Sequence, residues 1–131
     1  MKDCIFCKIV AGEIPASKIY EDEDFLAFLT INPTREGHTL VVPKKHVSYV
    51  VEMTNDNYLK MMKVVKTLTN KINDLLKPER MGMQVIGYDV AHTHVHIVPL
   101  FERGDMIELQ KIPQPTRQEL EATAEKIRSG L

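Results

Sequence analysis

The 131-residue sequence predicts an α+β fold, in which a small antiparallel sheet is covered by one long helix and a short C-terminal helix. Two observations support this class: short runs rich in β-branched and aromatic residues, and one long segment in which apolar residues recur every three or four positions. The hydrophobic fraction is 44%, which is enough for one core, and no internal repeat is present. We therefore expect residues 1–131 to form a single domain.

The first two strands are expected at residues 25–31 and 39–42. The first run is rich in aromatic and aliphatic residues and stops at Asn32-Pro33, whereas the second is largely β-branched and stops at Pro43. The polar segment between them contains a proline and a glycine, which is typical of a turn that joins antiparallel strands. A meander is the simplest topology.

Residues 54–76 predict a long amphipathic helix. Its apolar residues recur with helical spacing: Tyr58, Met61, Met62, Val65, Leu68, Ile72, Leu75 and Leu76. Thr54, Asn55 or Asp56 can cap its start, and Pro78 disfavours helical geometry at Lys77. The eight apolar residues form a stripe wider than one side of a small sheet requires, which favours a second contact surface on this helix.

The rest of the chain predicts two more strands and a last helix. Residues 83–86 and 95–101 have strand composition and are separated by a short turn at residues 87–91. A short helix follows from Thr116, because Thr116 and Glu119 match a capping box. The sequence thus predicts at least four strands and two helices.

The charge balance excludes some classes of partner. Lys and Arg total 17 against 18 for Asp and Glu, so the formal net charge of -1 offers no general argument for binding nucleic acid or an anionic membrane. No stretch approaches the roughly 18 apolar residues that a membrane helix needs. We expect a cytoplasmic protein that acts on a small molecule.

Three of the five histidines lie within five residues, as His92, His94 and His96. In a strand, alternation places all three imidazoles on one face. Three interpretations are open: histidines on an exposed strand, an open catalytic Zn²⁺ site, or nucleophilic catalysis in which a neutral imidazole attacks phosphorus while its neighbours hold the phosphate. The apolar continuation of the segment argues against the first interpretation, because it indicates a buried strand.

The two cysteines, Cys4 and Cys7, are too few for a disulfide scaffold. Their Cys-x-x-Cys spacing suits either a metal site or thiol–disulfide exchange. A thioredoxin-type motif would follow a strand inside a βαβ unit, whereas this pair lies at the N-terminus of the sequence. Zinc is therefore the better hypothesis.

Five segments occur together in a fixed order: CIFCKI from residue 4, GEIPA from residue 12, FLTINP from residue 28, GHTLVVPKKH from residue 37 and HTHVHIV from residue 92. Together they resemble the histidine triad family of nucleotide-binding hydrolases and transferases. The resemblance runs from residue 4 to about residue 101, and the last thirty residues add nothing to it.

The resemblance implies roles for individual residues. His94 would be the nucleophile that attacks the α-phosphorus and forms a nucleotidyl-histidine. His96 would contact the phosphate and leaving group, His92 would orient the ring of His94, and His38 would close the site from the neighbouring strand. The positions that hold the nucleobase in the family correspond to Ile5, Phe6, Ile9, Phe28 and Ile31, all of which are equally suited to core packing.

The same resemblance implies a structural metal and a second copy of the chain. Cys4, Cys7, His46 and His92 match a Cys₂His₂ zinc site that ties the N-terminus to the triad segment. Members of the family are homodimers, here expected to pair through the helix at residues 54–76 and the strand at residues 83–86.

Three departures from the family pattern concern the substrate. Thr30 stands where an acidic residue commonly binds the ribose hydroxyls, so at most one neutral hydrogen bond replaces a charged pair. The phosphate-binding loop is shortened to residues 87–91, which places Asp89 near the phosphate position. Leu100 stands where an arginine often follows the proline. The ribose contact is therefore expected to be weaker than in the family.

We expect a hydrolase or nucleotidyl transferase that acts on nucleoside monophosphate derivatives, such as phosphoramidates or dinucleoside polyphosphates. A nucleotide-binding or zinc-stabilised interaction module with little turnover is the alternative, and a three-histidine metalloenzyme is the third hypothesis.

Overall fold

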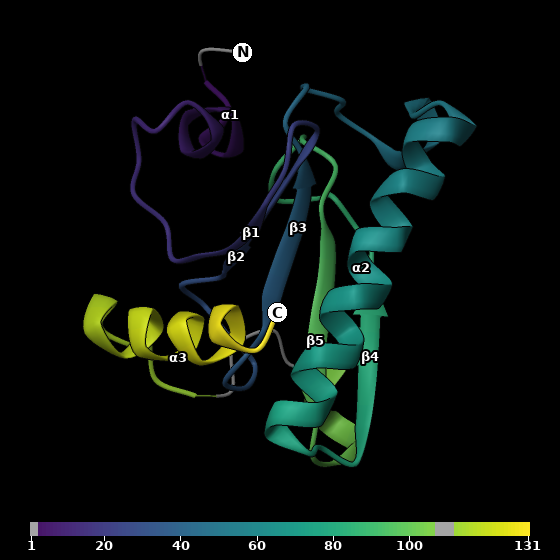
Figure 1. Cartoon of the computed structure of the whole chain (residues 1–131). Helices are drawn as coiled ribbons and strands as arrows, with labels where there is room; N and C mark the ends of the chain where they lie inside the picture. Colours follow the sequence, from purple (N-terminus) through teal and green to yellow (C-terminus); the bar gives the residue numbers. More distant parts are fainter. Residues whose placement is uncertain (1–2, 107–111) are drawn as a thin grey trace.

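A computed structural model describes residues 3–106 and 112–131. Within these residues a five-stranded antiparallel sheet has the strand order β1-β2-β3-β5-β4 (Figure 1). The strands are β1 (Lys18–Glu21), β2 (Phe25–Leu29), β3 (Thr39–Pro43), β4 (Arg80–Gln84) and β5 (Val95–Leu100). The helices are α1 (Ile5–Val10), α2 (Asn55–Leu76) and α3 (Arg117–Ser129), with 3₁₀ turns η1 (Val50–Glu52) and η2 (Arg103–Met106). The predicted α+β class is confirmed.

The two faces of the sheet pack against different helices (Figure 1). On one face the alternate strand residues Phe25, Val41 and Ile97 pack against α2 and α3. On the other face Leu26, Phe28, Leu40 and Val42 pack against Phe6 and Ile9 of α1. His96 belongs to this second face, because it pairs with Leu40 across β3 and β5. The sheet thus carries its larger core on one side and the histidine segment on the other.

Both predicted helices form with the predicted ends. Thr54 caps α2 by accepting the Asn57 N–H at 3.2 Å, and the helix ends at Lys77, which has a left-handed φ of 49° just before Pro78. Both bonds of the capping box between Thr116 and Glu119 are present at the start of α3.

The structure differs from the sequence prediction at four elements. The helix α1 and the strand β1 were not predicted, since α1 buries only Phe6 and Ile9 and β1 buries only Ile19, which is too little to show a period. The fourth strand lies at Arg80–Gln84 rather than at residues 83–86, because this edge strand has no fully buried residue to mark it. The connection to β5 spans residues 85–94 rather than 87–91, although β5 begins at Val95 as predicted.

No helix among the described residues is long and apolar enough to cross a membrane.

Candidate active site and metal centre

The imidazole rings of four histidines lie close together beside α1: His38, His92, His94 and His96. The ring centroids of His94 and His96 are 5.0 Å apart, and those of His38 and His96 are 5.2 Å apart. Phe6 of α1 packs edge-on against His94 at 5.0 Å and against His92 at 5.9 Å. The expectation that one strand carries the whole triad is wrong, because only His96 lies in β5 while His92 and His94 precede it. The segment before the strand still brings their rings together.

The ring of His94 is oriented by the backbone. Its Nδ1 lies 2.7 Å from the carbonyl oxygen of His92, and a carbonyl can only accept, so Nδ1 carries the proton of the neutral ring. The other nitrogen, Nε2, then holds a lone pair. His94 is buried, at 6% exposure, so water has little access to the lone pair on Nε2.

The tautomers of His38 and His96 follow from one backbone donor. The Thr34 N–H donates to His38 Nδ1 at 3.0 Å, so the proton of the neutral His38 ring is on Nε2. That Nε2–H faces His96 Nδ1 at 2.9 Å and donates to it. His96 in turn carries its proton on Nε2. The triad segment therefore presents a lone pair on His94 beside an N–H donor on His96.

Burial keeps this pair uncharged. Desolvation, reinforced by the neighbouring His96, lowers the pKa of His38 to about 3. Desolvation and the nearby His94 lower the pKa of His96 to about 4, although the charge of Asp89 opposes the shift. Both rings are neutral at pH 7, which is the state required for the tautomers described above.

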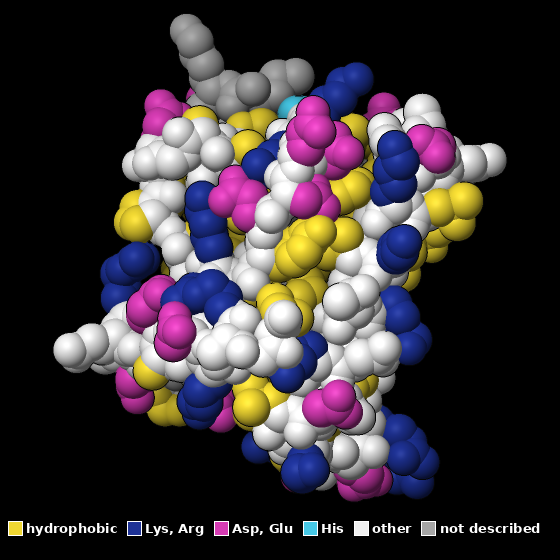
Figure 2. Space-filling view, viewed as in Figure 1, with side chains coloured by type: hydrophobic (Ala, Val, Ile, Leu, Met, Phe, Trp, Pro, Cys, Tyr) yellow, Lys and Arg dark blue, Asp and Glu magenta, His cyan; other side chains and the backbone are white. Residues whose placement is uncertain are grey.

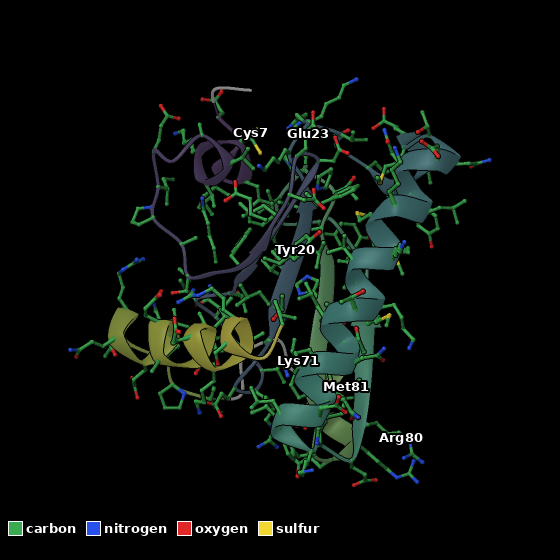
Figure 3. The ribbon with its side chains drawn as sticks, viewed as in Figure 1. Cys7, Tyr20, Glu23, Lys71, Arg80 and Met81 are labelled. Carbon is green, nitrogen blue, oxygen red and sulfur yellow. The ribbon has the colours of Figure 1, made fainter. Side chains whose placement is uncertain are left out.

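A second cluster joins the N-terminus to the triad segment. The thiols of Cys4 and Cys7 and the rings of His46 and His92 offer four ligand atoms within 4.8 Å of one another. His92 Nδ1 lies 3.2 Å from the Cys4 sulfur, and His46 Nδ1 lies 3.3 Å from the Cys7 sulfur. Cys7 projects from α1 toward the sheet (Figure 3).

The orientation of His92 fits a metal ligand. Its Nε2 donates to the Pro43 carbonyl at 2.8 Å, so the lone pair on Nδ1 points at the two sulfurs. Two thiolates and two neutral imidazoles are the donor set of a closed tetrahedral zinc site. Among the described residues this is the only group of three or more metal-binding side chains found close together, and it does not include His94 or His96.

The residues expected at the nucleobase divide into two groups. Phe6, Ile9 and Phe28 are buried in the core on the α1 face. Ile5 is 44% exposed and Ile31 is 52% exposed, so these two side chains remain accessible to a ligand.

The two polar residues expected near the sugar and phosphate have different environments. The Thr30 hydroxyl accepts the Asn32 N–H at 3.2 Å, which leaves its own O–H free to donate to another group. Asp89 is exposed on the loop before β5, and its charge acts on His96.

Several groups that shape the site are backbone atoms and escaped the sequence prediction. The Thr34 N–H, the Pro43 carbonyl and the His92 carbonyl each fix a histidine ring. No side-chain pattern identifies such groups, because every residue type except proline offers the same donor and acceptor.

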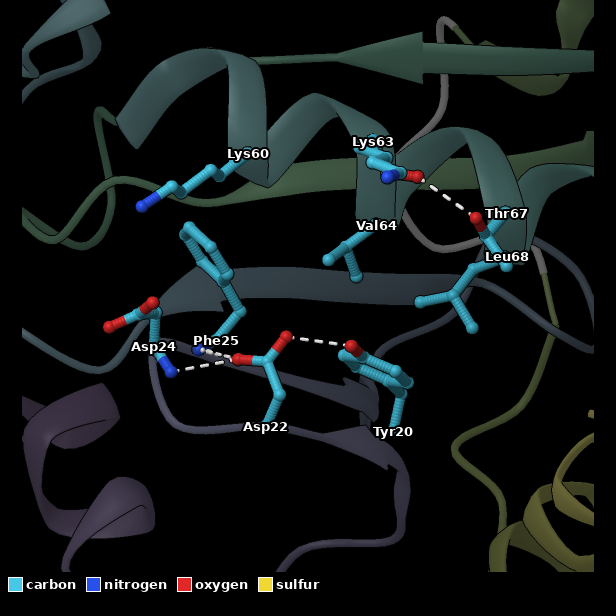
Figure 4. A pocket seen from close by; sticks show the side chains of 9 residues that line it. All are labelled: Tyr20, Asp22, Asp24, Phe25, Lys60, Lys63, Val64, Thr67 and Leu68. Atoms are coloured by element: carbon cyan, nitrogen blue, oxygen red, sulfur yellow. Dashed lines mark hydrogen bonds between the residues drawn. The ribbon is translucent and has the colours of Figure 1, made fainter. Parts of the chain in front are cut away.

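A cavity of about 310 Å³ lies on the other face of the sheet, between α2 and the β1–β2 hairpin (Figure 4). Phe25, Val64 and Leu68 provide its apolar lining, and hydrophobic side chains are visible in this region in Figure 2. Asp22 at its border accepts from Tyr20 and from two backbone N–H groups, so this carboxylate serves the hairpin. None of the residues lining this cavity belongs to the histidine or cysteine clusters.

The fold and the histidine cluster define a protein of the histidine triad class. The HIT domain family model matches residues 11–103, and the chain belongs to this family. An uncharacterized HIT-like protein of Methanocaldococcus jannaschii is 48% identical over 106 residues, which span 78% of this chain and 81% of that protein.

Two further relatives are informative. The adenosine 5'-monophosphoramidase of Schizosaccharomyces pombe is 41% identical over 101 residues, which span 73% of each chain. The crystal structure of a Zn-bound histidine triad family protein from Mycobacterium smegmatis superposes with a TM-score of 0.82 at 30% identity, covering 98% of this chain and 93% of that one.

Proposed function

We propose that the protein is a hydrolase or nucleotidyl transferase that cleaves nucleoside 5'-monophosphoramidates and related nucleoside monophosphate derivatives through a covalent nucleotidyl-histidine. The observation that carries this proposal is the orientation of His94, whose Nδ1 donates to the His92 carbonyl and whose Nε2 retains a lone pair. A nucleophile that attacks phosphorus needs such a lone pair. The similarity to an adenosine 5'-monophosphoramidase supports the substrate class.

The reaction proceeds in two displacements at one phosphorus atom. His94 Nε2 attacks the α-phosphorus, the bond from phosphorus to the amine nitrogen breaks, and the departing amine takes up a proton. Water or another acceptor then attacks the same phosphorus, the bond to Nε2 breaks, and one proton is released. His96 donates its Nε2–H to the phosphate and leaving group, where it stabilises developing charge.

The nucleoside is held at the ends of α1 and β2. Ile5 and Ile31 are exposed enough to contact the base, while Phe6, Ile9 and Phe28 form the packed layer beneath it. Thr30 offers a single hydroxyl to the ribose. Asp89 approaches from the loop before β5, where it contacts the sugar or the leaving amine rather than a phosphate of like charge.

Cys4, Cys7, His46 and His92 would hold one structural Zn²⁺. Bound zinc would tie α1 to the triad segment and would leave no open position for catalysis. In this proposal, the chemistry at phosphorus belongs to His94 and His96, which do not contribute to the four-ligand cluster.

We also propose that two copies of the chain pair through α2 and the edge strand β4. Leu59 and Tyr58 on α2 are 66% and 39% exposed, and Met83 on β4 is 42% exposed. Val85 and Ile86, just beyond β4, are 41% and 37% exposed. An edge strand flanked by apolar side chains is readily covered by a second chain.

The test of the proposed function is capture of the covalent adduct. Mixing the protein with an adenosine phosphoramidate and quenching in the steady state should add one adenylyl group by intact-mass analysis, and His94→Ala should show no adduct. The rate should fall by more than about a thousandfold in His94→Ala, since a covalent nucleophile has been removed.

Val51→Ala is the matched control, because Val51 lies in η1, outside the residues placed in the site, and is 74% exposed. This variant should still form the adduct. Turnover that survives in His94→Ala would contradict the nucleophile assignment. Binding of AMP by the wild-type protein with neither adduct nor turnover would reject the hydrolase and favour a nucleotide-binding module.

A further inference from the structure

Arg35 and Asp105 form an ion pair between two segments that lie 70 residues apart in the sequence. Arg35 Nη2 lies 3.0 Å from Asp105 Oδ1, and the Asp105 side chain is fully buried. The other carboxylate oxygen, Oδ2, accepts the N–H groups of Phe101 and Glu102 at 2.7 and 3.1 Å. The ion pair therefore anchors Arg35 to the turn that follows β5.

The Arg35 side chain has two more contacts with the same turn. Its guanidinium lies 5.6 Å from the centre of the Phe101 ring and 3.4 Å from a Glu102 carboxylate oxygen. A planar guanidinium that is paired and stacked in this way has few other positions open to it. The backbone of Arg35 is consequently fixed relative to the end of β5, the strand that carries His96.

Arg35 also belongs to the turn that carries His38. The His38 N–H donates to the Arg35 carbonyl at 3.1 Å, which closes the turn. Thr34, the residue before Arg35, donates its N–H to His38 Nδ1. His38 lies one residue before β3, whose pairing with β5 begins at Thr39. The orientation of the His38 ring therefore depends on this turn as well as on the sheet.

Either His38 or His96 can be the donor in the hydrogen bond between their rings. With the Thr34 N–H on Nδ1, His38 donates from Nε2 and His96 keeps its proton on Nε2. Without that donor, the neutral pair can reverse, so that His96 donates from Nδ1 and turns a lone pair toward the phosphate. A lone pair repels a phosphate oxygen, whereas an N–H stabilises it.

We propose that Arg35 and Asp105 are positioning residues for the reaction: their ion pair holds the turn at residues 34–38 so that His96 presents an N–H rather than a lone pair to the phosphate. This inference rests on the proposed function. Neither residue touches the substrate in this scheme, and both act through His38.

The first measurement needs no substrate. The ¹⁵N shifts of the imidazoles, recorded at pH 7 on the whole 131-residue chain, report which nitrogen of each ring is protonated. We expect the wild-type protein to carry its protons on Nε2 of both His38 and His96. In Arg35→Gln and Asp105→Asn both rings should show averaged shifts from two exchanging tautomers. Wild-type shifts in these variants would overturn the proposal.

The second measurement is the steady-state kinetics on an adenosine phosphoramidate. We expect kcat to fall by about ten- to a hundredfold in Arg35→Gln and Asp105→Asn, because a small displacement of a catalytic group has effects of this size. The KM should change by less than about threefold, since neither Arg35 nor Asp105 contacts the nucleoside in this scheme. Arg35→Lys retains the charge without the planar fork and should lie between the wild-type protein and Arg35→Gln.

Val65→Ala is the matched control for lost stability, because Val65 is fully buried in the core on the opposite face of the sheet. It should lower the melting temperature while leaving the imidazole shifts and kcat unchanged. An equal loss of kcat in Val65→Ala would overturn the proposal, as that result would assign the effect to stability alone. If Asp105→Asn does not fold, Arg35→Lys gives the same comparison.

The two proposals fail in different ways. A wild-type protein that turns over no phosphoramidate contradicts the proposed function, and the tautomer measurement still decides whether the ion pair controls the His38–His96 pair. Turnover by His94 with unchanged shifts and rates in the Arg35 variants contradicts the positioning role only.

Discussion

Gly37 has a backbone conformation that residues with a side chain rarely adopt. Its φ is 91°, in the left-handed region, and a Cβ atom built there would lie 2.6 Å from Leu76 Cδ1. Gly37→Ala should therefore lower the free energy of unfolding by roughly 2 to 4 kcal/mol, from backbone strain and displacement of the Leu76 side chain together. Denaturant unfolding followed by circular dichroism measures this loss.

Gly12 provides the matched comparison for that prediction. Its φ is 81°, and nothing lies within 4 Å of the equivalent Cβ position. Gly12→Ala should lower the free energy of unfolding by only about 1 to 2 kcal/mol, which is the cost of the left-handed backbone conformation alone. If the two variants lose the same stability, the contact with Leu76 contributes nothing at this site.

Thr30 is expected to weaken discrimination at the sugar. A single neutral hydrogen bond is worth about 0.5 to 1.5 kcal/mol, so the deoxynucleoside phosphoramidate should be used with kcat/KM within about tenfold of the ribonucleoside compound. Thr30→Asp should raise the preference for ribose, because a carboxylate can accept from both hydroxyls. Steady-state kinetics on the matched pair of substrates provides the measurement.

Asp89 is the competing contact for the sugar. A wild-type preference for ribose above about a hundredfold that disappears in Asp89→Ala would place the sugar contact on Asp89 and refute the argument from Thr30. If the preference for ribose persists in Asp89→Ala, Asp89 does not provide the sugar contact.

At the scale of residues, sequence reasoning predicted the groups that have distinctive side chains. Cys4, Cys7, His46 and His92 were predicted to come together, and the structure brings their ligand atoms within 4.8 Å of one another. The grouping of His38, His94 and His96 follows the same logic, although their catalytic roles stay predictions. Arg35 and Asp105 were not predicted, because a single arginine and a distant aspartate carry no local pattern.

Among the elements, α1 depends most on outside support. An isolated helix of six residues is unstable in water, so α1 relies on its packing against the sheet and on the cluster of cysteines and histidines. Removal of metal by a chelator should therefore lower the melting temperature by at least several degrees, which calorimetry can measure.

Cys4→Ser separates the metal from other effects of the chelator. This variant should melt at a lower temperature than the wild-type protein and should no longer respond to the chelator. A wild-type protein that is equally stable after chelation, with zinc verified absent, would contradict a structural role for the metal.

The long elements could be predicted from the sequence more completely than the short ones. The 22 residues of α2 show their period several times and have a cap at each end, and α3 has both bonds of its capping box. By contrast, β1 has four residues and β4 lies at the sheet edge, where burial does not alternate. A short or edge element shows too few buried positions for its boundaries to be found.

At the scale of the whole molecule, the buried histidines should make stability fall in acid. His38 and His96 have folded-state pKa values of about 3 and about 4, below the ordinary value of 6.5. As the pH falls below 6.5, the unfolded chain binds protons that the folded chain does not, so the free energy of unfolding falls until the pH reaches the folded-state pKa values of about 4 for His96 and about 3 for His38.

The slope of the unfolding free energy against pH follows from the number of protons that the unfolded chain binds and the folded chain does not. Because both His38 and His96 have lower pKa values in the folded chain than in the unfolded chain, the free energy of unfolding should fall by roughly 2 kcal/mol per pH unit between about pH 6 and pH 4.5. Urea unfolding at a series of pH values measures it. In His96→Gln the slope should decrease by about half, and an unchanged slope would show that His96 does not contribute.

The apolar surface on α2 and β4 predicts the assembly of the molecule. Light scattering at micromolar concentration should give twice the chain mass of 15.0 kDa. Leu59→Lys should shift the protein toward the monomer, because Leu59 is 66% exposed in the single chain. Leu131→Lys, which changes a 52% exposed residue after α3, is the control and should leave the dimer intact. A wild-type mass of one chain would reject the pairing.

His92 contributes to two sites through different parts of the same residue. Its ring faces the cysteines, and its carbonyl accepts the proton of the His94 ring. Substitution to alanine removes the first contribution and keeps the atom that makes the second. Side-chain mutagenesis would therefore class His92 as a metal ligand and overlook its other contribution. Replacing the amide between residues 92 and 93 with an ester would test this contribution, because the ester carbonyl is a weaker acceptor; the same change also removes the Thr93 N–H, which donates to the Val47 carbonyl at 2.7 Å.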